Sequence, residues 1–484
     1  MAARGEAAAQ RIADEARRTG HQNARQPDPP ILSLRPDGAS DLGANALNRR
    51  RSQRKAGQLV VPVDPVPPLP SPSPSAMPYA GRPPKLLFLV TEDWYFCSHR
   101  LPVARAAREA GFEVVVATRV RAHGDAIRDE GFALRPIPWR RRGDGLFGAA
   151  LAISAISRLY RRERPDIVHH VALKPVLFGG IARRLAFAHT AEAPARIDSV
   201  MGLGSGFSRA TTAARLRQPA LGLALRLVAG GSRGWIVVQN PEDRDALAGL
   251  GIDPRRIALI RGSGVDIGRF VPLPELRGDT VVVALVSRML RDKGVFDATA
   301  AIRKLRAQGL AIELLLAGPT DPDNPNSLTP EELRALAAEP GIEWLGHVAD
   351  VRAVWRRAAL AVLPSTYGEG VPKTLLEAAA CARPLIATDV PGCREVVHPG
   401  ATGILVPPHD ADELAKAVAQ LAGDPARRAA LGQAGRRLIE DEFTDESVAR
   451  ETLALYRAAL AERHGFPAAR EIPGKNPAPG AKST

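Results

Sequence analysis

Short apolar runs alternate with amphipathic stretches from residue 85 onward. The apolar runs in the first half of this region lie at residues 86–90, 113–117, 166–171, 196–200 and 235–239. An apolar run of about four to eight residues bounded by turns is typical of a strand buried on both faces of a parallel sheet. The stretches at 102–111, 151–163 and 175–186 have the helical spacing of apolar residues. The pattern predicts a doubly wound α/β domain.

A second alternation of the same kind follows. Its predicted strands lie at residues 280–287, 312–318, 342–346, 360–365, 384–388 and 403–408, and its helices include 350–359, 374–382 and 411–421. The segment between the two alternations, 266–279, has the proline and charge content of an interdomain linker. We therefore expect two Rossmann-like doubly wound domains that face a cleft, at residues 85–265 and 280–440, followed by a helix at 441–462.

The two ends of the chain have a different composition. Residues 1–84 contain basic clusters and the proline- and serine-rich run 62–75, and residues 463–484 are also tail-like. Such segments bury too little apolar surface to fold, so both are predicted to be disordered. No stretch approaches the roughly 20 apolar residues of a spanning helix. The most apolar one, 216–230, carries Arg217 and Arg226 and is predicted to be a core helix, with an interfacial helix as the alternative.

The charge balance indicates an anionic partner. Lys and Arg number 66 against 52 Asp and Glu, which gives a formal net charge of +14. The partner could be nucleic acid, an acidic membrane surface or a phosphorylated small molecule, and the charge alone does not choose among them. The three cysteines, Cys97, Cys381 and Cys393, fit neither a disulfide framework nor a zinc site. A reducing, cytoplasmic location is expected.

The stretch from Leu363 to Pro384 carries the strongest chemical signal. A predicted strand ends there, a glycine-containing turn follows, and a helix opens near Pro372. The backbone N–H groups of Gly370, Val371 and Thr374 would be free to bind a phosphate at the positive end of the helix dipole. Glu369 and Glu377 flank this anion site, and carboxylates there would bind sugar or ribose hydroxyls. Alone, each would be read as a helix cap or an exposed helix residue.

Two cations follow the first strand of the second alternation. Arg288 lies at the carboxyl end of the strand and Lys293 stands five residues later, before a helix. Ligands of open α/β sheets bind at this edge, so the two cations could neutralise a diphosphate without a metal. A pair of solvated surface cations is the alternative. Asp321 and Asp323 imitate a metal-binding pair of aspartates, but we expect their loop to lie far from these cations and assign no metal.

These residues together resemble a known family. The motifs are Glu369 and Glu377 with seven residues between them, the Arg288/Lys293 pair, and the segment SGVD at 263–266. The pattern resembles the retaining glycosyltransferases of family 4, which have the GT-B fold. The most similar subgroup extends lipid-diphosphate-linked sugars in surface glycan assembly, and it shares EDWYFCSHRLP, DIVHHVALKP, VQNPEDRDAL and EGVPK.

The resemblance implies residue roles on the donor side. Arg288 and Lys293 would hold the diphosphate of a nucleotide sugar, Glu369 would contact the transferred sugar, and Glu377 would bind the ribose. The departing phosphate would assist proton removal from the acceptor on the same face, so that the anomeric configuration is retained. No separate cofactor is expected, and UDP is expected rather than GDP as the carrier of the sugar.

The acceptor side follows the family pattern less closely. Relatives carry His-x-His after the fourth strand, whereas this chain reads His169-His170-Val171. His170 is therefore either a catalytic residue that binds the transferred sugar or a core residue. Lys174 would meet an acceptor phosphate or face solvent. Three further candidate acceptor residues follow the first strand: Glu92, Ser98 and His99. Asn240 and Asp243 are predicted to cap a helix.

The resulting prediction is an enzyme that transfers a sugar from a nucleotide diphosphate to a lipid-linked glycan. The acceptor would bind the amino-terminal half, and basic clusters such as Arg161-Arg162 would rest on the cytoplasmic face of the inner membrane or be merely solvated. No nucleic-acid partner is expected. Two alternatives stay open: a sugar-nucleotide epimerase with the same fold, and a non-enzymatic basic protein that binds nucleic acid or a membrane surface.

Overall fold

The computed structural model describes residues 82–139, 145–188, 190, 192–202, 212–229, 234–276, 278–367 and 370–465, with only the backbone at 212–220. These residues belong to one unit of the chain, Pro72–Thr484. The predictions of disorder at 1–84 and 463–484 fall almost wholly outside the described residues.

The first sheet contains seven parallel strands in the order β3-β2-β1-β4-β5-β6-β7. Their bounds are β1 Lys85–Glu92, β2 Glu113–Arg119, β3 Ala133–Pro136, β4 Ile167–Val171, β5 Ala195–Ser199, β6 Gly234–Val238 and β7 Ile257–Leu259. All five strands predicted for this region are confirmed. The sequence analysis missed β3, which has four residues including Arg135 and Pro136, and β7, which is apolar but only three residues long.

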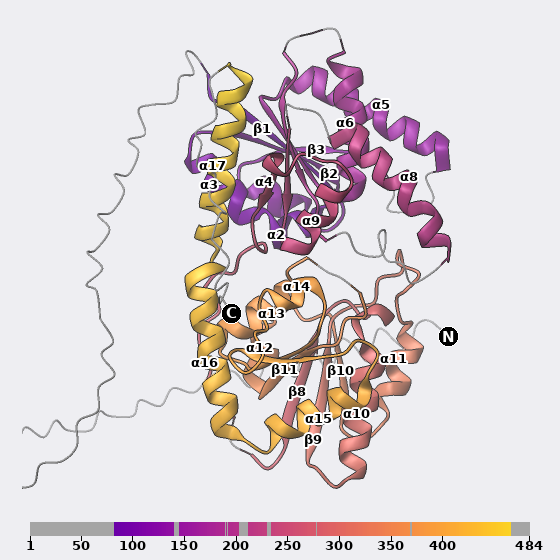
Figure 1. Ribbon diagram of the computed structural model, residues 1–484, viewed down its shortest axis with the longest axis vertical. Helices are drawn as coiled ribbons and strands as arrows, with labels where there is room; N and C mark the ends of the chain where they lie inside the picture. The colour runs from indigo at the N-terminus through magenta and orange to yellow at the C-terminus, as the bar shows by residue number, and fades with distance from the viewer. Residues whose placement is uncertain are drawn as a thin grey trace, which may run out of the picture. The chain divides into compact units, whose positions relative to one another are not determined.

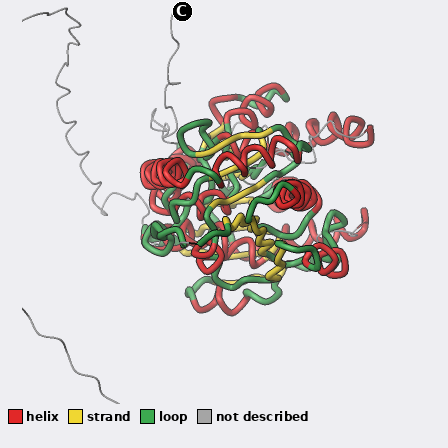
Figure 2. The backbone as a smooth tube through the Cα atoms, turned by 90° about the horizontal axis from the view of Figure 1, so that it is seen from below, coloured by secondary structure: helices red, strands yellow, loops and turns green. Residues whose placement is uncertain are grey.

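Figure 2 shows the strands of the protein with helices around them. The helices of the first sheet are α2 Asp93–His99, α3 Leu101–Glu109, α4 Gly124–Asp129, α5 Gly145–Glu163, α6 Leu173–Ala186, α8 Thr212–Ala229 and α9 Pro241–Gly249. Helices cover both faces of this sheet, because β1 contributes to one core with α3 and to another with α5 and α6. Side chains of β1 alternate between the two faces: Phe88 lies in the core under α3, and Leu87 in the core under α5 and α6.

The second sheet contains six parallel strands in the order β10-β9-β8-β11-β12-β13. The strands are β8 Val281–Val286, β9 Ile312–Ala317, β10 Ile342–Gly346, β11 Leu360–Leu363, β12 Leu385–Thr388 and β13 Gly403–Val406. The helices are η2 Arg291–Lys293, α10 Val295–Ala307, α11 Pro330–Ala337, α12 Arg352–Arg357, α13 Lys373–Ala380, α14 Pro391–Arg394, α15 Ala411–Ala422 and α16 Pro425–Glu442. All six predicted strands are confirmed.

The last helix returns to the first sheet. Helix α17, Asp445–Arg463, follows α16 and lies beside α3 in Figure 1. Leu455, Tyr456 and Leu460 are buried in the same core as Phe88. The carboxyl-terminal helix therefore completes the core of the amino-terminal sheet. The exact domain limits at residues 265/266 and 279/280 stay predictions.

Helix α8 contains the most apolar stretch of the sequence. Its described side chains divide between two environments, because Leu225 and Val228 are buried whereas Leu223 and Leu227 are more than half exposed. The helix thus contributes to the core on one side only. In the described part of the chain, every helix is too short or too polar to cross a bilayer.

Both sheets contain a point at which the strand order reverses. This point lies between β1 and β4 in the first sheet and between β8 and β11 in the second. The connections that leave neighbouring strands there run to opposite faces, which leaves a crevice at the carboxyl ends of the strands. The two crevices are the positions where the fold itself favours a ligand.

Candidate active site

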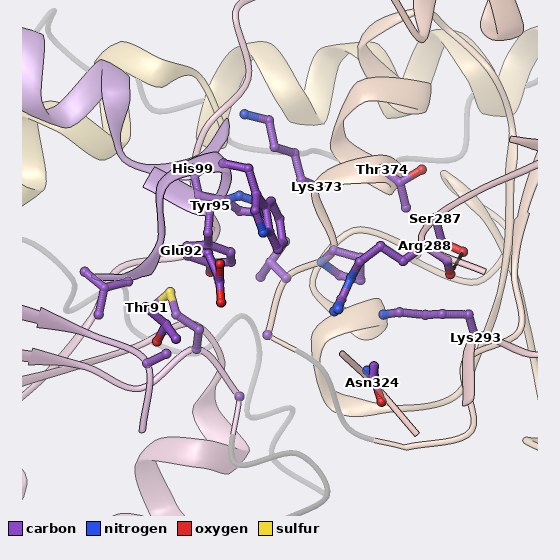
Figure 3. A pocket seen from close by; sticks show the side chains of 18 of the residues that line it. Thr91, Glu92, Tyr95, His99, Ser287, Arg288, Lys293, Asn324, Lys373 and Thr374 are labelled. Carbon is purple, nitrogen blue, oxygen red and sulfur yellow. Dashed lines mark hydrogen bonds between the residues drawn. The ribbon is translucent and has the colours of Figure 1, made fainter. Parts of the chain in front are cut away.

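One cavity opens at both crevices. Its volume is about 810 Å³, and its walls include the strand ends Val90, Val171, Val286 and Leu363. Figure 3 shows side chains entering it from both sheets, among them Glu92 and His99 from the first and Arg288 and Lys293 from the second. A cavity of this size accommodates a ligand of several hundred daltons.

Arg288 and Lys293 line the same wall of this cavity. Arg288 follows β8, and Lys293 ends the one-turn helix η2. The chain then turns into α10 at Gly294, whose φ is +71° and whose hypothetical Cβ would lie 2.0 Å from the carbonyl oxygen of Pro364. Glycine is the residue that fits both this conformation and this contact. The turn places both cationic side chains at one edge of the sheet.

The loop with Asp321 and Asp323 lies next to these cations. Asp321 pairs with Arg288 at 2.5 Å, and Asp323 lines the cavity and pairs with Arg119 and Arg121 of the first sheet. The expectation that this loop lies far from the cations is therefore wrong. The reason is topological: β9 is the parallel neighbour of β8, so the loops that follow both strands leave the sheet at the same edge. Both aspartates of the loop form ion pairs with arginines.

The turn before α13 forms the adjoining wall. Gly370, Val371 and Thr374 line the cavity, and α13 begins at Lys373 without a side chain that caps its first turn. The N–H of Val371 donates to Oε1 of Gln239 at 3.0 Å, so the expectation that it is free is wrong. Gln239 directly follows β6 of the first sheet. Its side chain therefore accepts this hydrogen bond from the opposite side of the cavity.

The two predicted carboxylates are placed differently. Glu369 lies outside the described residues. Glu377 is one turn inside α13 and is absent from the cavity wall. Burial, with a smaller contribution from the negative charge of Asp445, raises its pKa to about 7 against the opposing influence of Lys373 and Arg269.

This pKa predicts a pH-dependent stability. The folded chain keeps the Glu377 proton between about pH 4.5 and 7, whereas the unfolded chain releases it, so the stability of the wild type falls as the pH rises through that window. We expect Glu377→Gln to remove up to about 3 kcal/mol of this loss. Urea unfolding of both proteins across the window measures the difference, and parallel curves would contradict the prediction. Asp445, whose pKa is raised to about 6, also lowers the stability of both proteins as the pH rises.

The acceptor-side candidates lie at the junction of β1 and α2, because Glu92 ends β1 and both Ser98 and His99 belong to α2. Glu92 lines the cavity, and its carboxylate lies 3.5 Å from Arg119 and 3.7 Å from Arg121. His99 lines the cavity and stacks on Tyr95 with ring centroids 4.2 Å apart. Burial and the cations Lys373 and Arg100 hold the pKa of His99 well below its usual value, so the ring is neutral at neutral pH.

Ser98 and Lys174 complete the acceptor-side set. The hydroxyl of Ser98 lies 2.5 Å from Nδ1 of His99, and its carbonyl accepts a hydrogen bond from Lys373, whereas Ser98 is absent from the cavity wall. Lys174 lines the cavity near the start of α6, with its Nζ 5.3 Å from the ring centre of Phe178. The structure thus gathers Glu92, His99 and Lys174 opposite the donor-side cations.

His170 lies in the core, the second of its two alternatives. Its ring is fully buried, with Nδ1 2.7 Å from Asp198 and Nε2 2.9 Å from the hydroxyl of Tyr160. His169 is also buried, between Ser199 and Tyr456. Desolvation lowers the pKa of His170 although Asp198 opposes the shift. Neither histidine lines the cavity.

Two family models match the chain, one in each half. "Glycosyl transferase 4-like" matches residues 85–226 and "Glycosyl transferases group 1" matches residues 280–424. The chain belongs to the group 1, family-4-like glycosyltransferases. It is accordingly a retaining glycosyltransferase that uses a nucleotide sugar, and its two parallel sheets have the GT-B architecture of its structural neighbours.

Among the relatives of this glycosyltransferase is the capsular polysaccharide biosynthesis glycosyltransferase CapM of Staphylococcus aureus, which is 25% identical over 67% of this chain and 85% of the relative. The N,N'-diacetylbacillosaminyl-diphospho-undecaprenol alpha-1,3-N-acetylgalactosaminyltransferase of Campylobacter jejuni is 24% identical over 74% and 94%. The solved structure of Anabaena Alr3699/HepE with UDP-glucose matches with a TM-score of 0.60 at 17% identity, over 77% of this chain and 99% of that one.

The glycosyltransferase also contains site residues that sequence analysis missed. Gln239 and the side chain of Lys373 line the cavity, and neither was assigned a role from the sequence. Gln239 directly follows a predicted strand, and this position was the available signal. The prediction for its neighbour Asn240 is confirmed, because Asn240 caps α9 by accepting a hydrogen bond from the N–H of Asp243 at 2.7 Å.

Proposed function

We propose that this glycosyltransferase moves a hexose or N-acetylhexosamine from a UDP-sugar to a polyprenyl-diphosphate-linked glycan, in surface polysaccharide or glycan biosynthesis at the cytoplasmic face of the inner membrane. One observation carries the proposal. Arg288, Lys293 and the opening turn of α13 converge on a single cavity, whose other wall comes from the first sheet.

The donor diphosphate lies against Arg288 and Lys293. Two cations and the positive end of α13 offset the charge that builds up on the diphosphate as the sugar bond breaks. Asp321 holds the guanidinium of Arg288 in place from the side. The proposal places Glu369 against the transferred sugar and Glu377 against the ribose, next to the turn of Gly370, Val371 and Thr374. No metal is assigned a step.

The acceptor enters from the side of Glu92, His99 and Lys174. The ammonium group of Lys174 binds a phosphate of the acceptor, and the neutral ring of His99 binds a hydroxyl. The acceptor hydroxyl attacks on the face from which the diphosphate departs, and a phosphate oxygen takes its proton, which retains the anomeric configuration. His170 supports this wall from the core.

Two relatives support the choice of substrates. The Anabaena protein was solved with UDP-glucose bound, and the C. jejuni enzyme is named for transfer to a diphospho-undecaprenol-linked sugar. Lys174 and the two donor-side cations give this chain separate positive groups on opposite walls of the cavity. That arrangement suits two phosphorylated substrates.

Nucleotide binding tests the donor site. UDP at about 100 times its dissociation constant should stabilise the wild type by roughly 2.7 kcal/mol, and GDP and ADP should stabilise it less. We expect Lys293→Ala to lose most of this response in a thermal-shift experiment. Arg291→Ala is the matched control, because Arg291 lies in the same short helix but pairs with Glu332 away from the cavity. Equal responses of the two variants would count against the assignment.

A further inference from the structure

Helices α5, α6 and α8 lie side by side on one face of the first sheet. Helix α6 packs between the other two, as Figure 1 shows. Their inner sides bury Ile156 of α5, Val176 of α6 and Leu225 of α8 against the sheet. The opposite sides of the three helices therefore point away from the protein in the same direction, and we call their exposed residues the outer face.

The outer face is unusually apolar. Seven of the ten large hydrophobic side chains that are exposed in the described part of the chain lie on these three helices. Helix α5 exposes Phe147 at 78% and Leu151 at 51%, α6 exposes Leu185 at 59%, and α8 exposes Leu227 at 56%. Phe147 and Leu151, like Leu223 and Leu227, are four residues apart and share one side of a helix. This clustering differs from the isolated exposed apolar residues of an ordinary surface.

The same face is basic and lacks acidic side chains. Arg158, Arg162, Arg184 and Arg226 are exposed among the apolar residues. The sequences of the three helices contain a single acidic residue, Glu163. Glu163 is buried at the end of α5, where it pairs with Arg135 and Lys85. The helices therefore add no negative charge to the outer face.

We propose that the outer face of α5, α6 and α8 docks on the surface of an anionic lipid bilayer. Apolar side chains of this kind insert at the boundary between headgroups and acyl chains, and the arginines bind the headgroup phosphates. A second copy of the chain fits less well, because a symmetric contact would bring the arginines of both copies together. A nucleic acid would satisfy the arginines but would leave Phe147, Leu151 and Leu185 in water.

The docking surface is connected to the active site through α6. This helix begins with Leu173 and Lys174 in the cavity wall and carries Ile181 and Leu185 on the outer face. A lipid-linked acceptor held in the bilayer would thus reach the cavity along one helix. This step rests on the proposed function, whereas docking itself requires neither donor nor acceptor.

Sedimentation with vesicles tests the docking surface. We expect the full chain to bind vesicles of phosphatidylcholine with about one third phosphatidylglycerol, and to bind pure phosphatidylcholine much less. The triple variant Phe147→Ser, Leu151→Ser, Leu185→Ser should bind at least about tenfold more weakly. The matched control is Leu276→Ser with Phe296→Ser, which replaces exposed apolar residues outside the three helices. The control should bind as the wild type does.

Three results would overturn the proposal: equal vesicle binding by the triple variant and the wild type, no vesicle binding by the wild type, or a lipid-free dimer that the triple variant abolishes. The nucleotide response of the triple variant, measured by thermal shift, shows that it is folded. Loss of vesicle binding with an intact UDP response supports docking, whatever the acceptor proves to be. Vesicle binding without any UDP response in the wild type would reject the donor site and leave docking standing.

Discussion

Replacing Arg288 with alanine is expected to lower the rate of sugar transfer by about 100- to 1,000-fold, which is the loss typical of removing one group that stabilises transition-state charge. Arg288 is the cation at the carboxyl end of β8, lines the cavity, and lies over the ring of Trp94 at 5.7 Å. Its position between the two sheets puts it where the departing diphosphate gathers negative charge. Single-turnover transfer from a UDP-sugar measures the effect on the chemical step.

Two controls sharpen the test of Arg288. Arg288→Lys keeps the charge but loses the planar fork, so it should recover part of the rate. Arg291→Ala removes a nearby cation that faces away from the cavity and should leave the rate close to that of the wild type. A fall in rate that is as large for Arg291→Ala as for Arg288→Ala would mean that general positive charge, rather than a placed guanidinium, drives catalysis.

Replacing Asp198 with alanine is expected to destabilise the protein by about 3–5 kcal/mol, the usual cost of leaving one partner of a buried ion pair alone. The Asp198 carboxylate is fully buried, lies 2.8 Å from the guanidinium of Arg196, and accepts a hydrogen bond from His170. Its removal would leave the Arg196 charge and one ring nitrogen of His170 without that partner. Urea denaturation followed by circular dichroism measures the change in the free energy of unfolding.

Asp245→Ala is the matched control for Asp198. Asp245 pairs with Arg244 on the exposed side of α9, with its side chain 70% accessible, so its loss should change stability by less than about 1 kcal/mol. Asp198→Asn keeps the shape of the side chain and removes its charge, so its loss of stability should lie between those of Asp198→Ala and Asp245→Ala. A small effect of Asp198→Ala would show that Arg196 finds other partners, such as the carbonyl groups of Val228 and Ala229 that already accept from it.

The fold was largely predictable because parallel strands buried on both faces leave a plain apolar signal. Eleven of the thirteen strands in the described part of the chain were predicted, and the two missed strands, β3 and β7, are short edge strands. Sequence analysis also placed Arg288 and Lys293 at a strand end, where topology makes a crevice. These predictions depend on local pattern and on a general rule about sheets.

The missed features depend on contacts between residues distant in sequence. The partnership of Asp321 with Arg288 spans 33 residues, and that of Gln239 with Val371 spans 132. Periodicity contains no information on which loops meet, so the position of the aspartate loop was predicted wrongly. The burial of His170 had the same cause: only the packing of α5 brings Tyr160 against its ring.

The return of α17 has a consequence for the order of events during synthesis. Tyr456 packs on Phe88 in the first core and bonds to His169 through its hydroxyl, yet it emerges from the ribosome some 200 residues after β7. At typical rates of translation this interval is on the order of ten seconds or more. The first sheet must wait that long with part of its core uncovered, which makes the nascent chain a natural substrate for chaperones.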